Sequence, residues 1–193
     1  MSGQGFAIFD TAIGPCGIVW AERGVAGVQL PEADEARTRA RLQRRYPGAV
    51  QTAPPAAIQA AIDAMVALLR GEPIDLSFVE LDLDGVDDFH RHVYEVARAI
   101  PPGSTLTYGD VAARIGDRGA ARAVGQALGK NPFPIVVPCH RVLAAAGGTG
   151  GFSAPGGVNS KLRMLQIEGA HREGPPTLFD DIGGLGFSAR PPR

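Results

Sequence analysis

The chain has 193 residues, of which 45% are apolar and 20% are charged, so it can bury a core and is not a low-complexity segment. Its formal net charge of −1 gives no overall attraction for a polyanion. The two cysteines, Cys16 and Cys139, are too few for a disulfide scaffold, and no apolar run approaches the roughly 18 residues that cross a bilayer. We therefore expect a cytoplasmic protein with reduced thiols and no membrane partner.

The charges are unevenly distributed along the chain. Residues 1–86 contain seven arginines and no lysine against eleven carboxylates, a balance of −4, whereas residues 87–193 have twelve basic and nine acidic residues, a balance of +3. An acidic half joined to a basic half is typical of two units with different roles. The linker-like Gly85–Asp88 places the boundary, so we predict an N-terminal domain over 1–86, a second domain over 87–171 and a disordered tail over 172–193.

In the N-terminal half, short apolar runs separated by turn residues predict a small antiparallel sheet. Its strands are expected at 6–9, 17–20 and 25–30. Two helices follow, a charged and exposed one over 32–46 and an amphipathic one over 54–70. The run 74–83 alternates enough to predict a further strand.

The C-terminal half is predicted to be mostly helical. A helix over 88–100 ends at a proline-rich turn, and Thr107 and Asp110 have the spacing of a capping box at the start of the next helix. That helix and another over 118–129 form a predicted helix-turn-helix, and a last helix is expected over 158–168. The predicted fold class is thus α/β (α+β), with a small antiparallel sheet and helices followed by a mostly helical domain.

The predicted helix over 118–129 has two distinct faces. Ala120, Ala123, Val124, Ala127 and Leu128 share the apolar face. Arg118, Arg122, Gly125 and Gly129 share the opposite face, with Ala121 at its edge. A face of small residues and cations suits close approach to a DNA backbone, and it equally suits close packing against another helix.

Cys139 and His140 are the candidate chemical groups. A thiol attacks as a thiolate, and a nearby imidazole can take its proton. Pro132, Pro134 and Pro138 predict an extended connection to Cys139, in which adjacent side chains point apart, so either the backbone kinks or a water carries the proton. An isolated pair of this kind is also compatible with a core cysteine or with a cysteine hydrolase.

A zinc site formed by the cysteines and histidines is a further alternative. Cys16, His90, His92, Cys139 and His140 could converge in the fold, but the chain has no C-x2–4-C or H-x3–5-H spacing. We therefore predict no metal and no cofactor.

The segment Asn131–Val142 (NPFPIVVPCHRV) resembles the signature of the O6-alkylguanine-DNA alkyltransferases, also called methylated-DNA–protein-cysteine methyltransferases. Residues 119–125 resemble the recognition helix of that family, residues 107–112 its preceding helix and residues 161–169 its closing helix. The specific resemblance covers about residues 88–170, and the N-terminal half is similar to the variable domain of the family only in general form.

This resemblance implies a single-turnover methyltransferase that flips the damaged nucleotide out of the duplex. Cys139 would accept the alkyl group irreversibly, with His140 as the base acting through a water and Glu168 orienting the imidazole. Tyr108 would supply a proton to the departing guanine, and Asn131 would hold the turn between recognition helix and active site. The implied partner is double-stranded DNA containing O6-alkylguanine, with O4-alkylthymine as a further substrate, and the implied state is a monomer.

The resemblance also assigns residues that contact DNA and the flipped base. Arg122 corresponds to the arginine that fills the gap left by that base, and Ala121 and Gly125 lie against the minor groove, with Arg118 beside them. Val142, Phe152 and Ser153 are assigned to the substrate pocket. Phe152 stands where many members have tyrosine, and Ala154–Pro155 is an insertion in this wall of the pocket. The alternative function is an alkylated-DNA sensor that transfers nothing, although such sensors lack the cysteine.

Overall fold

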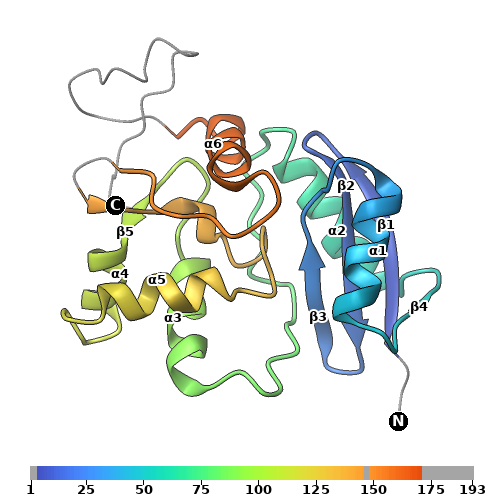
Figure 1. Ribbon diagram of the computed structural model, residues 1–193, viewed down its shortest axis with the longest axis horizontal. Coiled ribbons are helices and arrows are strands. Elements are labelled where there is room, and N and C mark those ends of the chain that lie inside the picture. Colours follow the sequence, from blue (N-terminus) through green and yellow to red (C-terminus); the bar gives the residue numbers. More distant parts are fainter. Residues whose placement is uncertain (1–3, 146–147, 171–193) are drawn as a thin grey trace.

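The computed structural model describes residues 4–145 and 148–170, so the predicted tail over 172–193 lies outside the described residues. Its fold is α+β, as predicted (Figure 1). The helices are α1 (Glu35–Arg45), α2 (Ala56–Leu68), α3 (Asp88–Arg98), α4 (Tyr108–Arg114), α5 (Ala121–Gly129) and α6 (Gly157–Ile167), with a short 3-10 turn η1 (Cys139–Arg141). The strands are β1 (Gly5–Thr11), β2 (Gly14–Ala21), β3 (Gly24–Gln29), β4 (Val50–Gln51), β5 (Leu106–Thr107) and β6 (Val142–Leu143).

The N-terminal half forms a sheet with strand order β3-β2-β1-β4. The strands β1, β2 and β3 form the predicted antiparallel meander, and the short β4, which the sequence did not predict, pairs parallel with β1. Because side chains alternate along a strand, the sheet has two apolar faces. Phe6 and Val19 meet Leu42 of α1 on one face, and a larger cluster on the other face includes Ile18 and Met65 of α2.

The predicted strand over 74–83 is wrong. Only Leu81 makes a single bridge, parallel to Val25, and the rest of the segment is a loop. The Arg98 guanidinium on α3 donates to the carbonyls of Leu76, Ser77 and Val79, at 3.2, 3.0 and 2.8 Å. These bonds satisfy the backbone without a neighbouring strand, and the apolar side chains still reach the core.

The C-terminal half packs α3 against α4 and α5, and α4 against α5. Thr107 and Asp110 form the predicted capping box at the start of α4. The helix α5 begins at Ala121, later than predicted, because Asp117 accepts a hydrogen bond from the Gly119 amide and holds a turn before it. The use of α4 and α5 as a helix-turn-helix stays a prediction.

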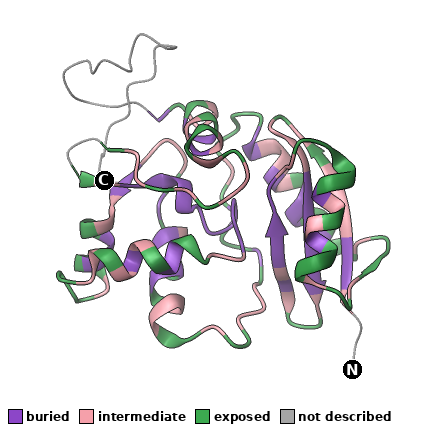
Figure 2. Cartoon of the chain, viewed as in Figure 1, coloured by how far each residue is buried: buried purple, intermediate pink, exposed green. Residues whose placement is uncertain are grey.

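The two halves share one apolar core. The main cluster of buried side chains runs from Cys16 and Ile18 in the sheet to Val124 in α5 and Met164 in α6, and Figure 2 shows buried positions on the facing sides of both halves. The Val28 amide of β3 also donates to the Pro132 carbonyl at 2.8 Å. The N-terminal sheet is therefore fixed directly to the segment that precedes Cys139. Within the described part of the chain, no helix is both long and apolar enough to span a membrane.

Candidate active site

The segment between α5 and Cys139 is a compact turn. The Val137 amide donates to the Phe133 carbonyl at 2.8 Å, and Ile135 has a φ of 75°, so the predicted extended connection is wrong. The Asn131 side chain donates to the Val137 carbonyl at 2.9 Å and accepts from the Phe133 amide at 2.9 Å. The prolines exclude helix, as expected, but the Asn131 amide closes the chain into a turn rather than leaving it extended.

Cys139 and His140 lie in η1, so the backbone kinks where an extended chain would have separated them. The Arg141 amide donates to the Pro138 carbonyl at 2.9 Å and closes this turn. Cys139 is 8% exposed and His140 is 1% exposed. The kink therefore leaves the sulfur facing an opening while the imidazole points into the protein.

A buried carboxylate connects His140 to a second basic residue. Glu168, at the end of α6, accepts from His140 Nε2 at 2.9 Å through Oε1. Arg141 binds the same carboxylate with both Nε and Nη2, at 2.9 and 2.8 Å, and also donates to the Ile100 carbonyl. The side chain of Glu168 is only 1% exposed, and the fork of Arg141 compensates its charge.

The pKa values follow from this burial and pairing. Burial acts to raise the pKa of Glu168, but the interactions with His140 and Arg141 outweigh it and bring that pKa to about 2. Burial lowers the pKa of His140 and outweighs the charge of Glu168, which acts to raise it, so the imidazole is neutral. With an ionised carboxylate on Nε2, the proton of the neutral ring belongs on Nε2. The lone pair is then on Nδ1, which has no hydrogen-bond partner among the described residues.

The Cys139 thiol is protonated at rest. Burial raises its pKa, and a hydrogen bond from Asn131 and the charge of Lys161 offset that shift only in part. The structure thus pairs a neutral thiol with a neutral base and places a cation nearby. These groups can exchange a proton when a substrate arrives, because Nδ1 is free to accept it.

Lys161 is a site residue that the sequence reasoning did not single out. It is fully buried in α6, donates to the Val142 carbonyl at 2.7 Å and lies 5.8 Å from the centre of the Tyr108 ring. Burial lowers its pKa to about 8. A signal was present, because Lys161, Met164, Leu165 and Glu168 follow the i, i+3, i+4, i+7 spacing of one helix face.

Tyr108 begins α4 beside the sulfur. Burial, and then the charge of a Cys139 thiolate, raise the pKa of its phenol. The loop at Gly150 passes directly over the ring, where a Cβ would lie 2.7 Å from the hydroxyl oxygen, and Gly150 has a φ of +69°. Only glycine fits there, so the loop closes over Tyr108 and keeps it half-buried.

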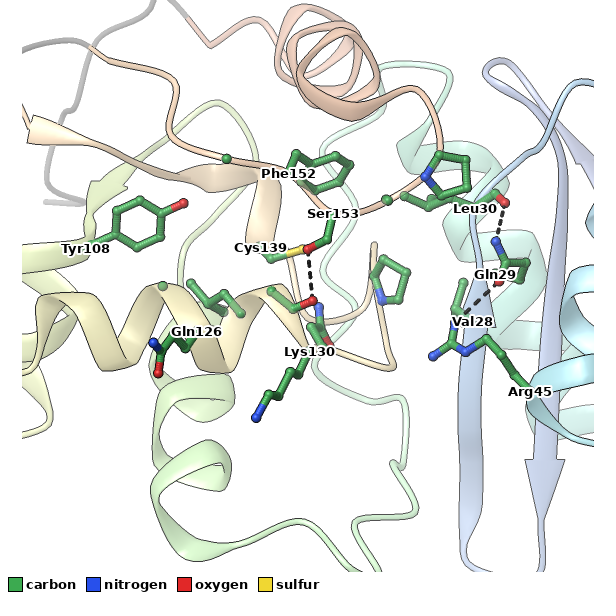
Figure 3. A pocket seen from close by; sticks show the side chains of 18 of the residues that line it. Val28, Gln29, Leu30, Arg45, Tyr108, Gln126, Lys130, Cys139, Phe152 and Ser153 are labelled. Atoms are coloured by element: carbon green, nitrogen blue, oxygen red, sulfur yellow. Dashed lines mark hydrogen bonds between the residues drawn. The ribbon is translucent and has the colours of Figure 1, made fainter.

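A cleft of about 870 Å³ leads to Cys139 (Figure 3). The cleft is lined by residues of α5, of the loop Gly151–Pro155, of β3 and of α1. Of the predicted site residues, the cleft brings together Tyr108, Ala121, Arg122, Gly125, Asn131, Cys139, Phe152 and Ser153. His140 and Glu168 are buried behind it, Arg118 is exposed before α5, and Val142 is fully buried in β6 away from the cleft.

Two hydrogen bonds, one on each side of the Ala154–Pro155 insertion, hold the loop over the cleft in place. Ser153 Oγ donates to the Gly129 carbonyl at the end of α5 at 2.9 Å, and Ser160 Oγ donates to the Pro155 carbonyl at 2.7 Å. Ser153 and Cys139 both line the cleft, and Figure 3 shows the bond that Ser153 makes there. The insertion therefore forms a wall of defined shape next to the sulfur.

The two faces of α5 are occupied as the helical wheel predicts. Val124, Ala127 and Leu128 are buried, and Arg122 is exposed. A Cβ at Gly125 would meet the ring of Tyr108, the first residue of α4, at 3.7 Å, which is ordinary contact, and outside α5 no other described residue would lie within 4 Å of it. Close helix packing is therefore not what requires glycine here, and the interpretation as a face for a nucleic acid is favoured.

The histidines and cysteines that the structure describes do not converge on a metal site. Cys16 is fully buried in β2 next to Thr11, and burial raises its pKa to about 12. Within residues 4–145 and 148–170, no three His, Cys, Asp or Glu side chains are grouped so that they could hold an ion.

Comparisons with known proteins agree with this geometry. Residues 88–170 match the family model described as the DNA-binding domain of 6-O-methylguanine DNA methyltransferase. A methylated-DNA–protein-cysteine methyltransferase of Methanothermobacter thermautotrophicus is 39% identical over 158 residues, which are 82% of this chain and 81% of that protein.

Two solved structures share the fold. That of Mycobacterium tuberculosis OGT in complex with DNA has a TM-score of 0.66 at 36% identity, over 85% of this chain and 92% of that one. That of the O6-methylguanine-DNA methyltransferase of Pyrococcus kodakaraensis has a TM-score of 0.65 at 29% identity, over 86% and 99%. A buried Cys–His–Glu site, a matching domain and relatives over most of the chain lead to one conclusion: this chain belongs to the family of methylated-DNA–protein-cysteine methyltransferases.

Proposed function

We propose that this protein repairs double-stranded DNA by moving the alkyl group of O6-alkylguanine onto Sγ of Cys139. The observation that carries the proposal is a thiol at the end of an open cleft, backed by the buried His140–Glu168–Arg141 network. Membership of a family of DNA methyltransferases supports it. The enzyme is thus a single-turnover methylated-DNA–protein-cysteine S-methyltransferase.

The proton of the thiol moves to His140 as the reaction begins. Glu168 holds Nε2–H, so Nδ1 accepts the proton from Cys139, directly or through a water. The thiolate then attacks the alkyl carbon in line, the S–C bond forms and the bond from that carbon to O6 of guanine breaks. In balance, a thiol and an alkylguanine give a thioether and guanine.

The departing guanine needs a proton, and Tyr108 is the donor in this proposal. Its phenol lies in the cleft with a pKa raised above the ordinary value, so it remains protonated until the guanine accepts the proton. The proton held by His140 restores the tyrosine through solvent. Lys161 stabilises the transient negative charge beside it, because the cation is buried and fixed by the Val142 carbonyl.

The resting thiol is protected by the same burial that makes it weakly acidic. Burial raises the pKa of Cys139, so the reactive thiolate forms only when a substrate draws the proton to His140. The thioether product has no ready route back to a thiol. Each molecule therefore acts once, and no cofactor is consumed.

The exposed face of α5 serves to hold the duplex. Arg122 fills the gap left by the flipped base, while Ala121 and Gly125 allow the backbone of α5 to approach the minor groove. O4-alkylthymine presents a similar alkyl ether and is the second substrate. Because the nucleophile, base and proton donor all come from one chain, we also propose that the protein acts as a monomer.

The test is a mass measurement after reaction with DNA. The protein is incubated with a duplex that carries one O6-methylguanine, and the intact mass and the modified peptide are determined. We expect one methyl group on Cys139, no gain for Cys139→Ala, and an unchanged gain for the matched control Cys16→Ala.

Two results would contradict the proposal. Binding of the methylated duplex with no gain in mass would identify a sensor. Repeated release of product by an unmodified protein would identify a hydrolase. Cys139→Ala should still bind the duplex, because Asn131 keeps its hydrogen bonds to the Val137 carbonyl and the Phe133 amide, which hold the turn after α5.

A further inference from the structure

The cleft that leads to Cys139 is positively charged on two opposite sides. Four basic side chains line it, and among the described residues no aspartate or glutamate does. Arg122 and Lys130 belong to α5 and its end, while Arg41 and Arg45 belong to α1 of the N-terminal half. The N-terminal half has a net balance of −4 over residues 1–86, so cations at the cleft run against its overall charge.

The sequence of α1 concentrates these cations on one side of the helix. Thr38 and Leu42 are buried and hold α1 on the sheet. At 100° per residue, Arg41 and Arg45 follow one another on the flank next to that buried face. Figure 1 shows α5 in the left half of the view and α1 in the right half, and residues of both helices line the cleft.

Local contacts hold the Arg45 guanidinium at the cleft. It donates to Gln29 Oε1 at 3.3 Å and stacks on the Tyr46 ring at 5.6 Å from the ring centre, and Figure 3 shows it directed toward the cleft. Gln29 is the last residue of β3, which is fixed to Pro132 by the bond from Val28. The charge of Arg45 therefore has a set position relative to the sulfur.

Arg41 is available although it has an acidic partner. Its guanidinium binds Glu32 at 2.9 Å, but 43% of the Arg41 side chain is exposed. An ion pair of this exposure contributes little and leaves donors free. Arginine is also the side chain best suited to bind a phosphate with two parallel hydrogen bonds.

We propose that Arg41 and Arg45 of α1 bind phosphates of the same duplex whose damaged base enters the cleft, so that the N-terminal half is part of the DNA-binding surface. This inference rests on the proposed function, because it takes the flipped nucleotide of a duplex as the occupant of the cleft. The nucleotide enters between the two basic sides, and the phosphates next to it are held by α5 on one side and by α1 on the other.

The binding test uses Arg41→Gln, Arg45→Gln and the double variant, each in a Cys139→Ala background. Affinity for a duplex with one O6-methylguanine is measured over a series of salt concentrations. Each lost phosphate contact reduces the slope of log K against log salt by about 1, so the double variant should lose about 2 and bind roughly tenfold more weakly at low salt. The lysine double variant should restore most of the slope.

Arg39→Gln is the matched control. It makes the same change in charge on the same helix, but Arg39 lies on the other flank of α1, where it binds Glu35 and Gln51. Its salt slope and affinity should equal those of the parent. Glu32→Gln should act in the opposite direction, because it releases Arg41 and removes a negative charge near the cleft, and should tighten binding by about twofold.

The reaction itself separates this inference from the proposed function. With Cys139 present, the double arginine variant should react with methylated duplex far more slowly than the parent. Its rate with free O6-benzylguanine should fall much less, because that substrate has no phosphate. Equal salt slopes for parent and double variant would overturn the inference while methyl transfer by the parent still supported the function. Equal losses with both substrates at an unchanged melting temperature would also overturn it, because a lost phosphate contact cannot slow the reaction of a substrate that has no phosphate.

Discussion

The two sides of the cleft use charge in opposite ways. On the side of η1 and α6, Glu168, Arg141 and Lys161 are buried and each is fixed by hydrogen bonds. On the side of α1, Arg41 and Arg45 stand at the surface of a layer whose interior is apolar. Buried charges can stabilise a developing charge because they need no reorganisation, whereas exposed cations can be shared with a mobile polyanion. In this protein the charged groups proposed to support the reaction are thus buried, whereas those proposed to bind DNA are exposed.

The largest expected effect is on the buried side. Glu168→Gln removes the carboxylate that holds His140 Nε2–H and leaves the charge of Arg141 buried without its partner. We expect transfer to slow by about 10² to 10⁴ and the free energy of unfolding to fall by about 3–5 kcal/mol. Single-turnover rates and urea unfolding measure the two effects. The exposed Glu95→Gln on α3 is the control, and equal rates for the two variants would remove Glu168 from the mechanism.

Met65→Ala tests whether the N-terminal half contributes stability rather than chemistry. Met65 is fully buried in α2 against the sheet, so its truncation should reduce the free energy of unfolding by about 2–5 kcal/mol. The rate of transfer from free O6-benzylguanine, per folded molecule, should not change. Gln59→Ala on the exposed face of the same helix should change stability by less than about 0.5 kcal/mol. A large loss of rate in a folded Met65→Ala protein would contradict the separation of roles.

Lys161→Met is expected to have the smallest effect of the three substitutions. Its effect is specific, because it changes how the free energy of unfolding depends on pH. The pKa of Lys161 falls from 10.5 to about 8 in the folded protein, so between these pH values the unfolded chain binds more protons than the folded one. The unfolding free energy of the parent should therefore gain a contribution that rises with pH across this window, on the order of 3 kcal/mol in total. The methionine variant should lack that rise.

The measurement is the difference in unfolding free energy between the parent and Lys161→Met as a function of pH. The pKa values of Cys16 and Tyr94 are raised to about 12, so their ionisation lowers the free energy of unfolding at high pH. This contribution is the same in both proteins and cancels in the difference. Transfer by the variant should be slower, because the charge of Lys161 acts to lower the pKa of Cys139 and its removal lets that pKa rise further. A pH-independent difference would show that Lys161 titrates normally.

Local patterns in the sequence predicted much of the fold. The three strands of the meander, the helices and the capping box at Thr107 were all confirmed. Two of the errors arose where a side chain satisfied backbone groups that the sequence pattern had left open. Arg98 replaced a strand partner over 74–83, and the Asn131 amide closed a turn where prolines suggested an extended chain.

The sequence by itself determined the acceptor, because Cys139 and His140 are neighbours in a continuous signature that needs no tertiary contact to be read. It also determined the small and basic face of α5, since helical periodicity is local. Only the tertiary structure decided that Lys161 and Arg141 are buried beside the sulfur and the carboxylate. It alone brought cations from an acidic half to the cleft. The physical reason is that burial and proximity between distant segments depend on how the layers pack, which no local pattern records.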